Sequence, residues 1–483
     1  MTFRAIPVAP KLIVLAGILG VLAGYGAVAF TIWIGTVTRF TVDYFYAQSL
    51  LSGPYLVGLV ACPAAGILAV AWLTRKFAPE AEGHGVPEVI VAIARHDGRI
   101  RSRVALVKII ASGICIGTGG SVGREGPIVQ IGSALGSTIG QWFGLAPRHV
   151  KVLVAAGAAA GISATFNAPL AGVVFASEII LGSFAVESLT PIVVASVLAD
   201  IIQVKIGEHG HGAAFPDIVH RYSGEWHELP SYIVLGLICG IAAALFLKFL
   251  YRFEDFGRIR LKSWWQRALL CGLCVGAVGT LYPASPFARI ESAVQEPAEL
   301  RSPALFGVGY ATVRTALHLK FEGNGYPTDE AASIVLTSEE MKSVIWWLLG
   351  LALLKPILTS ITLGGGGSGG VFAPSLFLGA CLGGVVGLVV NLVAPSLSAQ
   401  PGVYAIVGMG AVVAGTTHGV LSAILIVYEM TDNYQIILPI MAAAGLASLV
   451  SQVVDPESIY YKKLSRRGES IARGHEMYRL EHV

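Results

Sequence analysis

Apolar runs separated by short polar stretches dominate this chain. The long runs cover residues 12–35, 55–73, 232–249, 263–282, 343–363, 370–393, 403–430 and 436–454. A helix needs about 20 apolar residues to cross a bilayer, so these runs predict transmembrane helices. The first run is longer than the apolar core of a signal peptide, about 7–15 residues, and we expect it to be retained.

Other apolar segments are shorter and are interrupted by glycine and proline. They cover residues 104–116, 126–140, 151–164, 169–181, 191–204 and 305–319. Segments of this kind in a membrane protein indicate broken helices whose ends meet in the interior. The pattern therefore predicts an all-α polytopic membrane protein built from tilted and broken helices.

The polar stretches suggest how the chain is oriented. Arg4 and Lys11 precede the first apolar run, and a basic tail occupies residues 462–473. Positive charge beside membrane helices favours the cytoplasmic side, so we expect both termini to be cytoplasmic. A polar connection at residues 205–230 contains three histidines, which we interpret as part of a solvated loop rather than a metal site: His209, His211 and His220.

The composition agrees with an integral membrane protein. Charged residues make up 13% of the 483 residues, whereas soluble proteins carry about 25%. The mean hydropathy is +0.70. The 58 glycines suit close helix contacts in a membrane. A net charge of +3 gives no reason to expect a nucleic-acid partner, and the lipid bilayer is the expected surrounding.

The six cysteines all lie in apolar runs, and we predict no disulfide from them. Cys271 and Cys274 form a CxxC pair. A structural zinc site needs four ligands, and neither a second pair nor a histidine cluster accompanies this one. We therefore expect the cysteines to pack as small residues, with no metal and no cofactor.

An internal repeat divides the chain. Residues 119–136 align without gaps with residues 366–383 at an offset of 247, which also pairs Lys108 with Lys355. Related halves in a transporter place the substrate site between them, about a pseudo-two-fold axis. We predict a first half at residues 1–225, a second half at residues 226–460 and a short basic tail at residues 461–483. The letters alone do not say whether the repeat is inverted.

Both aligned loops are glycine-rich and reach a proline at the start of an apolar helix. These prolines are Pro127 and Pro374, and proline suits the first helical turn because its missing N–H would have no partner there. A helix N-terminus offers free N–H groups and about half a positive charge to an anion. Two such ends predict a weak anion site without a fixed charge that would trap the ion. The alternative is that the glycines only allow close helix packing.

Glu125 lies at the start of the first of these helices, beside Arg124. Charge at membrane depth is costly and indicates function. An ionised carboxylate there would occupy the anion site, whereas a protonated one could swing aside. We therefore predict that Glu125 is a gate; the alternatives are a helix cap or an ion pair with Arg124. The side chain of Arg124 is expected to orient the loop.

Three loops together resemble the anion-binding signatures of the CLC chloride channels and transporters. They read GHGVP at residues 83–87, GREGP at 123–127 and GVFAP at 370–374, and EMTDNYQIILP at 429–439 is also similar. The resemblance implies two antiparallel repeats of many tilted helices. It also implies chloride as the substrate and a homodimer with one pore per subunit.

The resemblance also assigns roles to individual residues. Glu125 matches the external gating glutamate. Tyr460 matches the tyrosine whose hydroxyl touches the central anion, although Tyr461 is adjacent and a slip of one residue remains open. The other residues expected to bind the anion come from the three loops: His84, Gly85, Arg124, Gly126, Val371 and Phe372.

Two positions depart from the family pattern. His84 stands where the family commonly has a serine that coordinates the anion. Either the imidazole replaces the serine or the ring points away and only the backbone serves. Ile179, beside Glu178, stands where antiporters usually carry an inner proton glutamate. Proton coupling must then use water, use another group such as His84, or be absent.

We therefore expect a chloride transporter in the bacterial inner membrane and favour Cl⁻/H⁺ exchange over a passive channel. Members of the family without cytoplasmic CBS domains are often exchangers, and the intact GREGP pattern argues against fluoride exchange. An intramembrane enzyme with Glu125 and His84 as acid and base is a remote alternative. No HExxH pattern, GxSxG nucleophile elbow between a strand and a helix, or paired-aspartate motif supports it, so we predict that the protein is not an enzyme.

Overall fold

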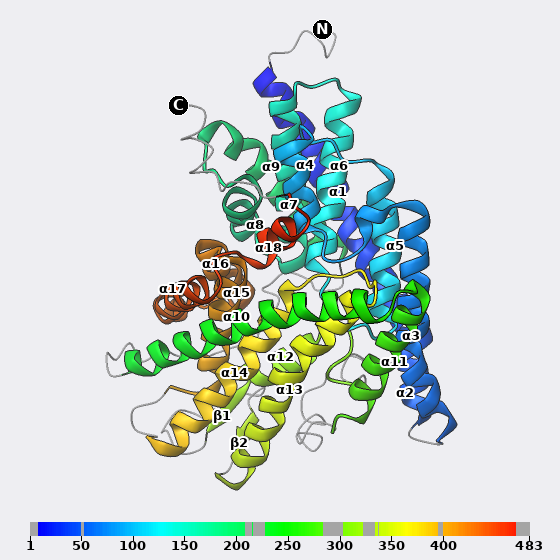
Figure 1. The fold of residues 1–483 in the computed structure, drawn as a ribbon. Coiled ribbons are helices and arrows are strands. Elements are labelled where there is room, and N and C mark those ends of the chain that lie inside the picture. The colour runs from blue at the N-terminus through cyan, green and yellow to red at the C-terminus, as the bar shows by residue number, and fades with distance from the viewer. Residues whose placement is uncertain are drawn as a thin grey trace.

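The computed structural model describes residues 8–49, 53–207, 215, 228–283, 303–321, 334–336, 338–394 and 399–469. Across these residues the chain is mainly helical (Figure 1). The histidines of the polar connection, His209, His211 and His220, lie outside the described residues, so their prediction as loop residues stays a prediction.

The N-terminal part of the chain forms the helices α1 to α9. Three short turns of π or 3-10 helix accompany them. The elements are α1 (Val8–Thr38), η2 (Arg39–Asp43), α2 (Tyr44–Ser49), α3 (Pro54–Phe77), η3 (Pro79–Ala81), α4 (Val86–Arg95), α5 (Arg103–Gly117), α6 (Glu125–Trp142), α7 (Pro147–Phe166), α8 (Pro169–Phe175), η4 (Ala176–Leu181) and α9 (Val186–Ile206).

The C-terminal part forms the helices α10 to α18 and one pair of very short parallel strands. The elements are α10 (Leu229–Arg260), α11 (Trp264–Leu281), α12 (Tyr310–Leu317), β1 (Leu319–Phe321), β2 (Ile334–Leu336), α13 (Ser338–Gly364), α14 (Phe372–Val393), α15 (Pro401–Thr417), α16 (Val420–Thr431), η8 (Tyr434–Ile436), α17 (Ile437–Val454) and α18 (Ile459–Arg466).

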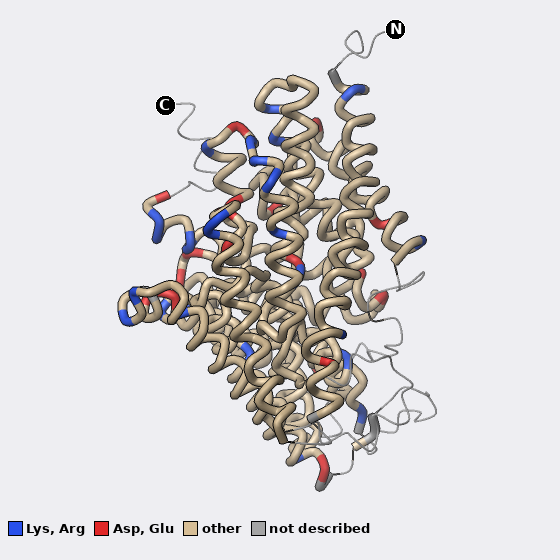
Figure 2. The backbone as a smooth tube through the Cα atoms, turned by 90° about the vertical axis from the view of Figure 1, so that its right-hand side faces the viewer, with Lys and Arg blue, Asp and Glu red and all other residues tan. Residues whose placement is uncertain are grey.

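The helices divide into long spans and shorter segments, as predicted. Within the described residues, eight helices are long and apolar enough to cross a membrane. The shorter apolar helices are Pro169–Leu181, Pro401–Thr417 and Val420–Thr431. Charged residues are sparse along the backbone (Figure 2). These features confirm an integral, multi-pass membrane protein.

The repeat seen in the sequence is also a repeat in packing. A Cβ atom at Gly132 of α6 would collide with the carbonyl oxygen of Gly157 in α7. A Cβ atom at Gly379 of α14 would collide in the same way with the carbonyl oxygen of Gly408 in α15. Only glycine allows these backbones to approach so closely. The pairs α6–α7 and α14–α15 are therefore equivalent units.

The two repeats are inverted. Gly123 and Gly370, which precede α6 and α14, pair as an antiparallel bridge at the centre of the molecule. From there α6 runs into the upper part of the molecule and α14 into the lower part (Figure 1). The N-terminal ends of the two helices thus face each other, as the CLC resemblance implies.

One long apolar run differs from its predicted form. Residues 403–430 form two helices rather than one, because His418 has a left-handed backbone with φ of 57° and ends α15. Asn167 ends α7 in the same conformation, with φ of 51°. A run of apolar letters does not reveal such a break.

The short helix α18 was also not predicted. All six cysteines are free thiols.

Candidate functional site

The loops singled out in the sequence meet at the centre of the molecule. Gly123 N–H donates to the carbonyl oxygen of Gly370 at 2.8 Å, and Gly370 N–H donates back at 2.6 Å. The first loop joins them, since Gly83 N–H donates to the carbonyl oxygen of Gly367 at 3.1 Å. Hydrogen bonds between the backbones therefore hold the loops of both halves in one cluster.

Each of these loops leads into the N-terminus of a helix. Helix α4 follows Gly85, α6 begins at Glu125, and α14 begins at Phe372. Gly85 has φ of 85°, a conformation that favours glycine. The first N–H groups of a helix have no partner inside it and carry partial positive charge. Three such ends converge here: the two predicted to form an anion site, at α6 and α14, and a third at α4.

The carboxylate of Glu125 lies between the two repeats. Its side chain is buried, with 1% exposure. Oε2 accepts a hydrogen bond of 3.3 Å from the backbone N–H of Ala373, in the first turn of α14. Oε1 accepts one from the hydroxyl of Tyr310, the first residue of α12. The carboxylate from one half thus occupies the N-terminal end of a helix from the other half.

The side chain of Arg124 contacts the end of α7 and the start of α12. Its Nη2 donates to the carbonyl oxygen of Thr165 at 3.4 Å, and its guanidinium lies 5.4 Å from the ring centre of Tyr310. These contacts tie the second loop to α7 and to α12. They agree with a side chain that orients the loop.

His84 and Tyr460 lie together on the other side of the cluster. Their ring centres are 6.3 Å apart, and their side chains are 4% and 2% exposed. His84 Nδ1 has no hydrogen-bond partner within the described residues. Of the two adjacent tyrosines, Tyr460 is buried and Tyr461 is only partly buried. The imidazole therefore faces the tyrosine rather than the exterior.

Ion pairs hold α18 against α4 and so position Tyr460. Glu88 of α4 lies 3.7 Å from Lys463 and accepts a hydrogen bond of 2.6 Å from Arg467. Lys463 and Arg467 both lie in the segment predicted as a basic tail, residues 461–483. The beginning of this segment therefore packs against the rest of the protein.

Two buried lysines at equivalent positions of the repeats fix the loops. Lys108 Nζ donates to the carbonyl oxygen of Gly83 at 2.7 Å. Lys355 Nζ donates to the carbonyl oxygen of Gly307 at 2.8 Å. The sequence alignment pairs the two lysines but did not assign them a role. Their contacts show that each holds the loop ahead of a helix start.

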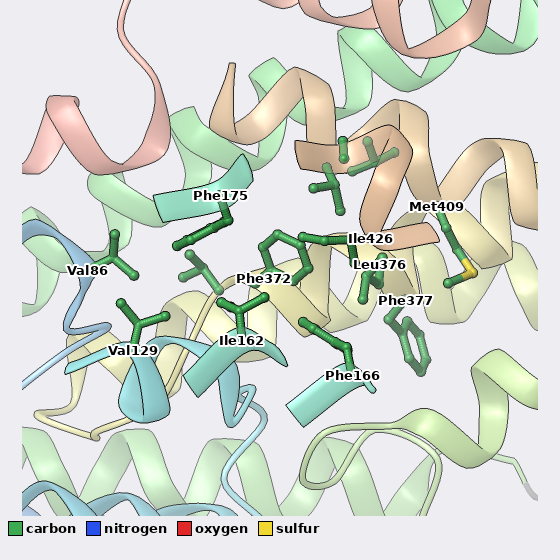
Figure 3. Packing of buried hydrophobic residues seen from close by; sticks show 14 of the residues in the cluster. Val86, Val129, Ile162, Phe166, Phe175, Phe372, Leu376, Phe377, Met409 and Ile426 are labelled. Carbon is green, nitrogen blue, oxygen red and sulfur yellow. The ribbon is translucent and has the colours of Figure 1, made fainter. Parts of the chain in front are cut away.

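Apolar side chains surround the N-terminal end of α14. Phe372 lies 5.6 Å from Phe166 and 6.4 Å from Phe175, measured between ring centres. Figure 3 shows Phe372 among Phe166, Phe175 and Ile162. This packing keeps the surroundings of the helix end apolar, and electrostatic interactions are stronger in such surroundings.

Glu178 and Glu429 bind helix ends across the two halves; the segments that contain them, residues 167–179 and 418–430, align at an offset of 251. Glu178 accepts a hydrogen bond of 2.8 Å from Ser422 N–H at the start of α16. Glu429 accepts one of 2.6 Å from Ala171 N–H at the start of α8. Ile179, the neighbour of Glu178, is 4% exposed and packs against Gly419. Glu178 therefore acts as a cap for a helix of the other half.

Tyr310 is the site residue that the sequence analysis missed. Gly307 and Gly309 precede it with φ of 54° and 85°, as Gly83 and Gly85 precede α4 with φ of 78° and 85°. The spacing Gly-x-Gly before a helix recurs at an offset of 224. That recurrence is the signal that could have located a fourth loop at the centre.

The fold defines a polytopic membrane protein with inverted repeats in which the N-terminal ends of helices from both repeats converge. A family described as "Voltage gated chloride channel" matches residues 65–452. This match covers most of the chain. The chain therefore belongs to the CLC family, whose members transport anions and are not enzymes.

Some proteins similar to this chain are named as chloride channels and others as H⁺/Cl⁻ exchange transporters. A ClcB-like chloride channel protein of Ralstonia nicotianae is 33% identical over 433 residues, which cover 87% of this chain and 88% of that protein. The H⁺/Cl⁻ exchange transporter ClcA of Cronobacter sakazakii is 30% identical and covers 94% of this chain and 89% of its own length.

Solved structures show the same fold. A slow cyanobacterial Cl⁻/H⁺ antiporter matches with a TM-score of 0.78 at 25% identity, over 95% of this chain and 98% of that chain. A CLC-type fluoride/proton antiporter matches with a TM-score of 0.69 at 20% identity, over 93% of this chain and 97% of that chain. The second likeness supports the fold alone.

Proposed function

We propose that the protein exchanges chloride for protons and that Glu125 is its external gate. The observation that carries this proposal is the contact between the Glu125 carboxylate and the N–H of Ala373. A carboxylate at that place takes the position of a bound anion. The names of the ClcA relatives and of the cyanobacterial antiporter support exchange as the mode of transport.

The gate works by competition for the helix end. Ionised Glu125 is attracted by the partial positive charge of α14 and blocks the site. Protonation removes this attraction, the side chain swings out, and chloride takes its place. The same event moves one proton and admits one anion, which is how the gate links the two movements.

The anion-binding groups come from both repeats. Free N–H groups at the starts of α6 and α14, around Gly126 and Phe372, bind the ion without a full countercharge. The hydroxyl of Tyr460 and the imidazole of His84 bind the anion at the inner end of the site. The unpartnered Nδ1 of His84 favours the interpretation in which the ring replaces the family's serine.

The proton route on the inner side does not use a glutamate at the family position, because Ile179 stands there. Glu178 is engaged as a helix cap. We infer that protons reach Glu125 through water or through His84.

Among the described residues, no group of three or more His, Cys, Asp or Glu side chains is arranged to hold a metal ion. We propose that transport needs no cofactor.

A passive chloride channel is the second candidate. Ile179 removes the usual proton acceptor, and one relative is named a chloride channel protein. In this alternative Glu125 still gates the path, but protons do not move with each cycle. Under either mode we propose a homodimer in a bacterial inner membrane with cytoplasmic termini.

A charge-removing variant tests the gate. In liposomes, chloride efflux through the native protein should rise as the pH falls, because acid protonates Glu125. Glu125→Gln should keep the efflux and lose its pH dependence. Glu187→Gln, at an exposed position of α9, is the matched control and should behave as the native protein. Loss of all flux in folded Glu125→Gln protein would contradict the gate.

A further inference from the structure

Tyr310 differs in chemistry from the residue at the equivalent helix start of the first repeat. It is the first residue of α12, whereas Val86 is the first residue of the equivalent helix α4. Each follows a glycine with φ of 85°. The first repeat therefore presents an apolar side chain at this helix start, and the second presents a hydroxyl group. The hydroxyl group of Tyr310 therefore has no counterpart at the equivalent position of the first repeat.

The ring of Tyr310 is held on two sides. Phe215 packs against it edge to face, with ring centres 6.0 Å apart. The guanidinium of Arg124 lies over the ring, 5.4 Å from its centre. Phe215 is itself anchored, since its N–H donates to the carbonyl oxygen of Met430 at 2.9 Å. The hydroxyl is therefore aimed at Glu125 before the carboxylate arrives, so little ordering is needed to form the hydrogen bond.

The hydrogen bond between Tyr310 and Glu125 favours one charge state. A hydroxyl that donates to an ionised acceptor forms a stronger bond than one that donates to a neutral carboxyl group. The other titratable or charged side chains within electrostatic range of Glu125 are Arg124, Lys355 and Tyr460. Tyr310, in contrast, donates a hydrogen bond directly to the carboxylate.

We propose that Tyr310 is a latch that holds the ionised gate in the blocking position and thereby sets the pH at which transport begins. This inference rests on the proposed gating role of Glu125. Tyr310 acts through that carboxylate, so it is a positioning residue for transport. The N–H of Ala373 binds the second carboxylate oxygen, and the two donors together hold the gate between α12 and α14.

Tyr310→Phe removes the hydroxyl and keeps the ring contacts with Phe215 and Arg124. Without the donor, the ionised carboxylate is less stable and binds a proton more readily. The pH of half-maximal chloride efflux should therefore move to less acidic values by about one unit. Efflux at pH 7.5 should rise several-fold. Tyr404→Phe, which removes a buried hydroxyl bonded to Ser231, is the matched control and should leave the pH profile unchanged.

The double variant separates the latch from the gate. In a Glu125→Gln background, Tyr310→Phe should add no further change. An unchanged pH profile of Tyr310→Phe, while Glu125→Gln abolishes the pH dependence, would overturn the latch and leave the gate. An equal effect of Tyr310→Phe with and without Glu125 would also overturn it. If Glu125→Gln kept the native pH dependence, the gate itself would fail.

Discussion

Glu178 and Glu429 each accept hydrogen bonds from the backbone at the start of a helix in the opposite repeat. The arrangement is reciprocal: the first half caps α16, and the second half caps α8. Carboxylates at helix starts are stabilised by the partial positive charge there. The pair thus joins the two repeats, and Glu178 directly precedes Ile179, the position that lacks the inner proton glutamate.

The capping role predicts a loss of stability without a loss of coupling. Glu178→Ala and Glu429→Ala should each lower the stability by about 1–2 kcal/mol, as lost caps do. Thermal unfolding in detergent measures this effect. The ratio of proton to chloride movement in liposomes should stay native in both variants. If Glu178→Ala abolished proton movement and unfolded at the native temperature, Glu178 would lie on the proton route instead.

The buried lysines predict a second stability effect. Lys108→Met and Lys355→Met would leave backbone carbonyl groups without their donors, at a cost of about 1–3 kcal/mol each. Each variant should unfold at a lower temperature and bind chloride more weakly, because its loop is no longer fixed ahead of a helix start. Lys342→Met, at an exposed position of α13, is the control. Native chloride affinity in both buried variants would contradict this role.

His84 predicts a change in anion binding. If the imidazole donates to the anion, His84→Ala should weaken chloride binding by about three- to tenfold, the value of one ordinary hydrogen bond. His84→Ser should restore most of the affinity, since a hydroxyl is the family's usual donor at this position. Isothermal titration calorimetry measures both. Equal affinities for the native protein and His84→Ala would show that only the backbone of the first loop serves.

Much of the architecture could be predicted from sequence because it depends on apolar length and on repetition. The apolar runs located the spans, and the ungapped alignment of residues 119–136 with 366–383 located the two helix starts that meet. The break at His418 was missed, because a left-handed residue other than glycine leaves no mark in hydropathy. The same break at Asn167, with its proline two residues later, was visible.

The site residues divide in a similar way: some have a signal in the sequence around them, and others depend on contacts between distant parts of the chain. Glu125 was recognisable because a charge beside a helix start in a membrane protein is costly. Tyr310 is 185 residues further along the chain, and a single tyrosine has no local signal that would pair it with a carboxylate. The cross-capping by Glu178 likewise depends on the contact between the two halves.

Coupled transport by the purified protein in liposomes tests the central claim most directly. With chloride concentrated inside and the membrane voltage fixed, internal and external pH are followed as chloride leaves. We predict that protons move into the liposomes against their own gradient, and that Glu125→Gln abolishes this movement while chloride still flows. Chloride efflux with no proton movement at any pH would contradict exchange and establish a gated channel.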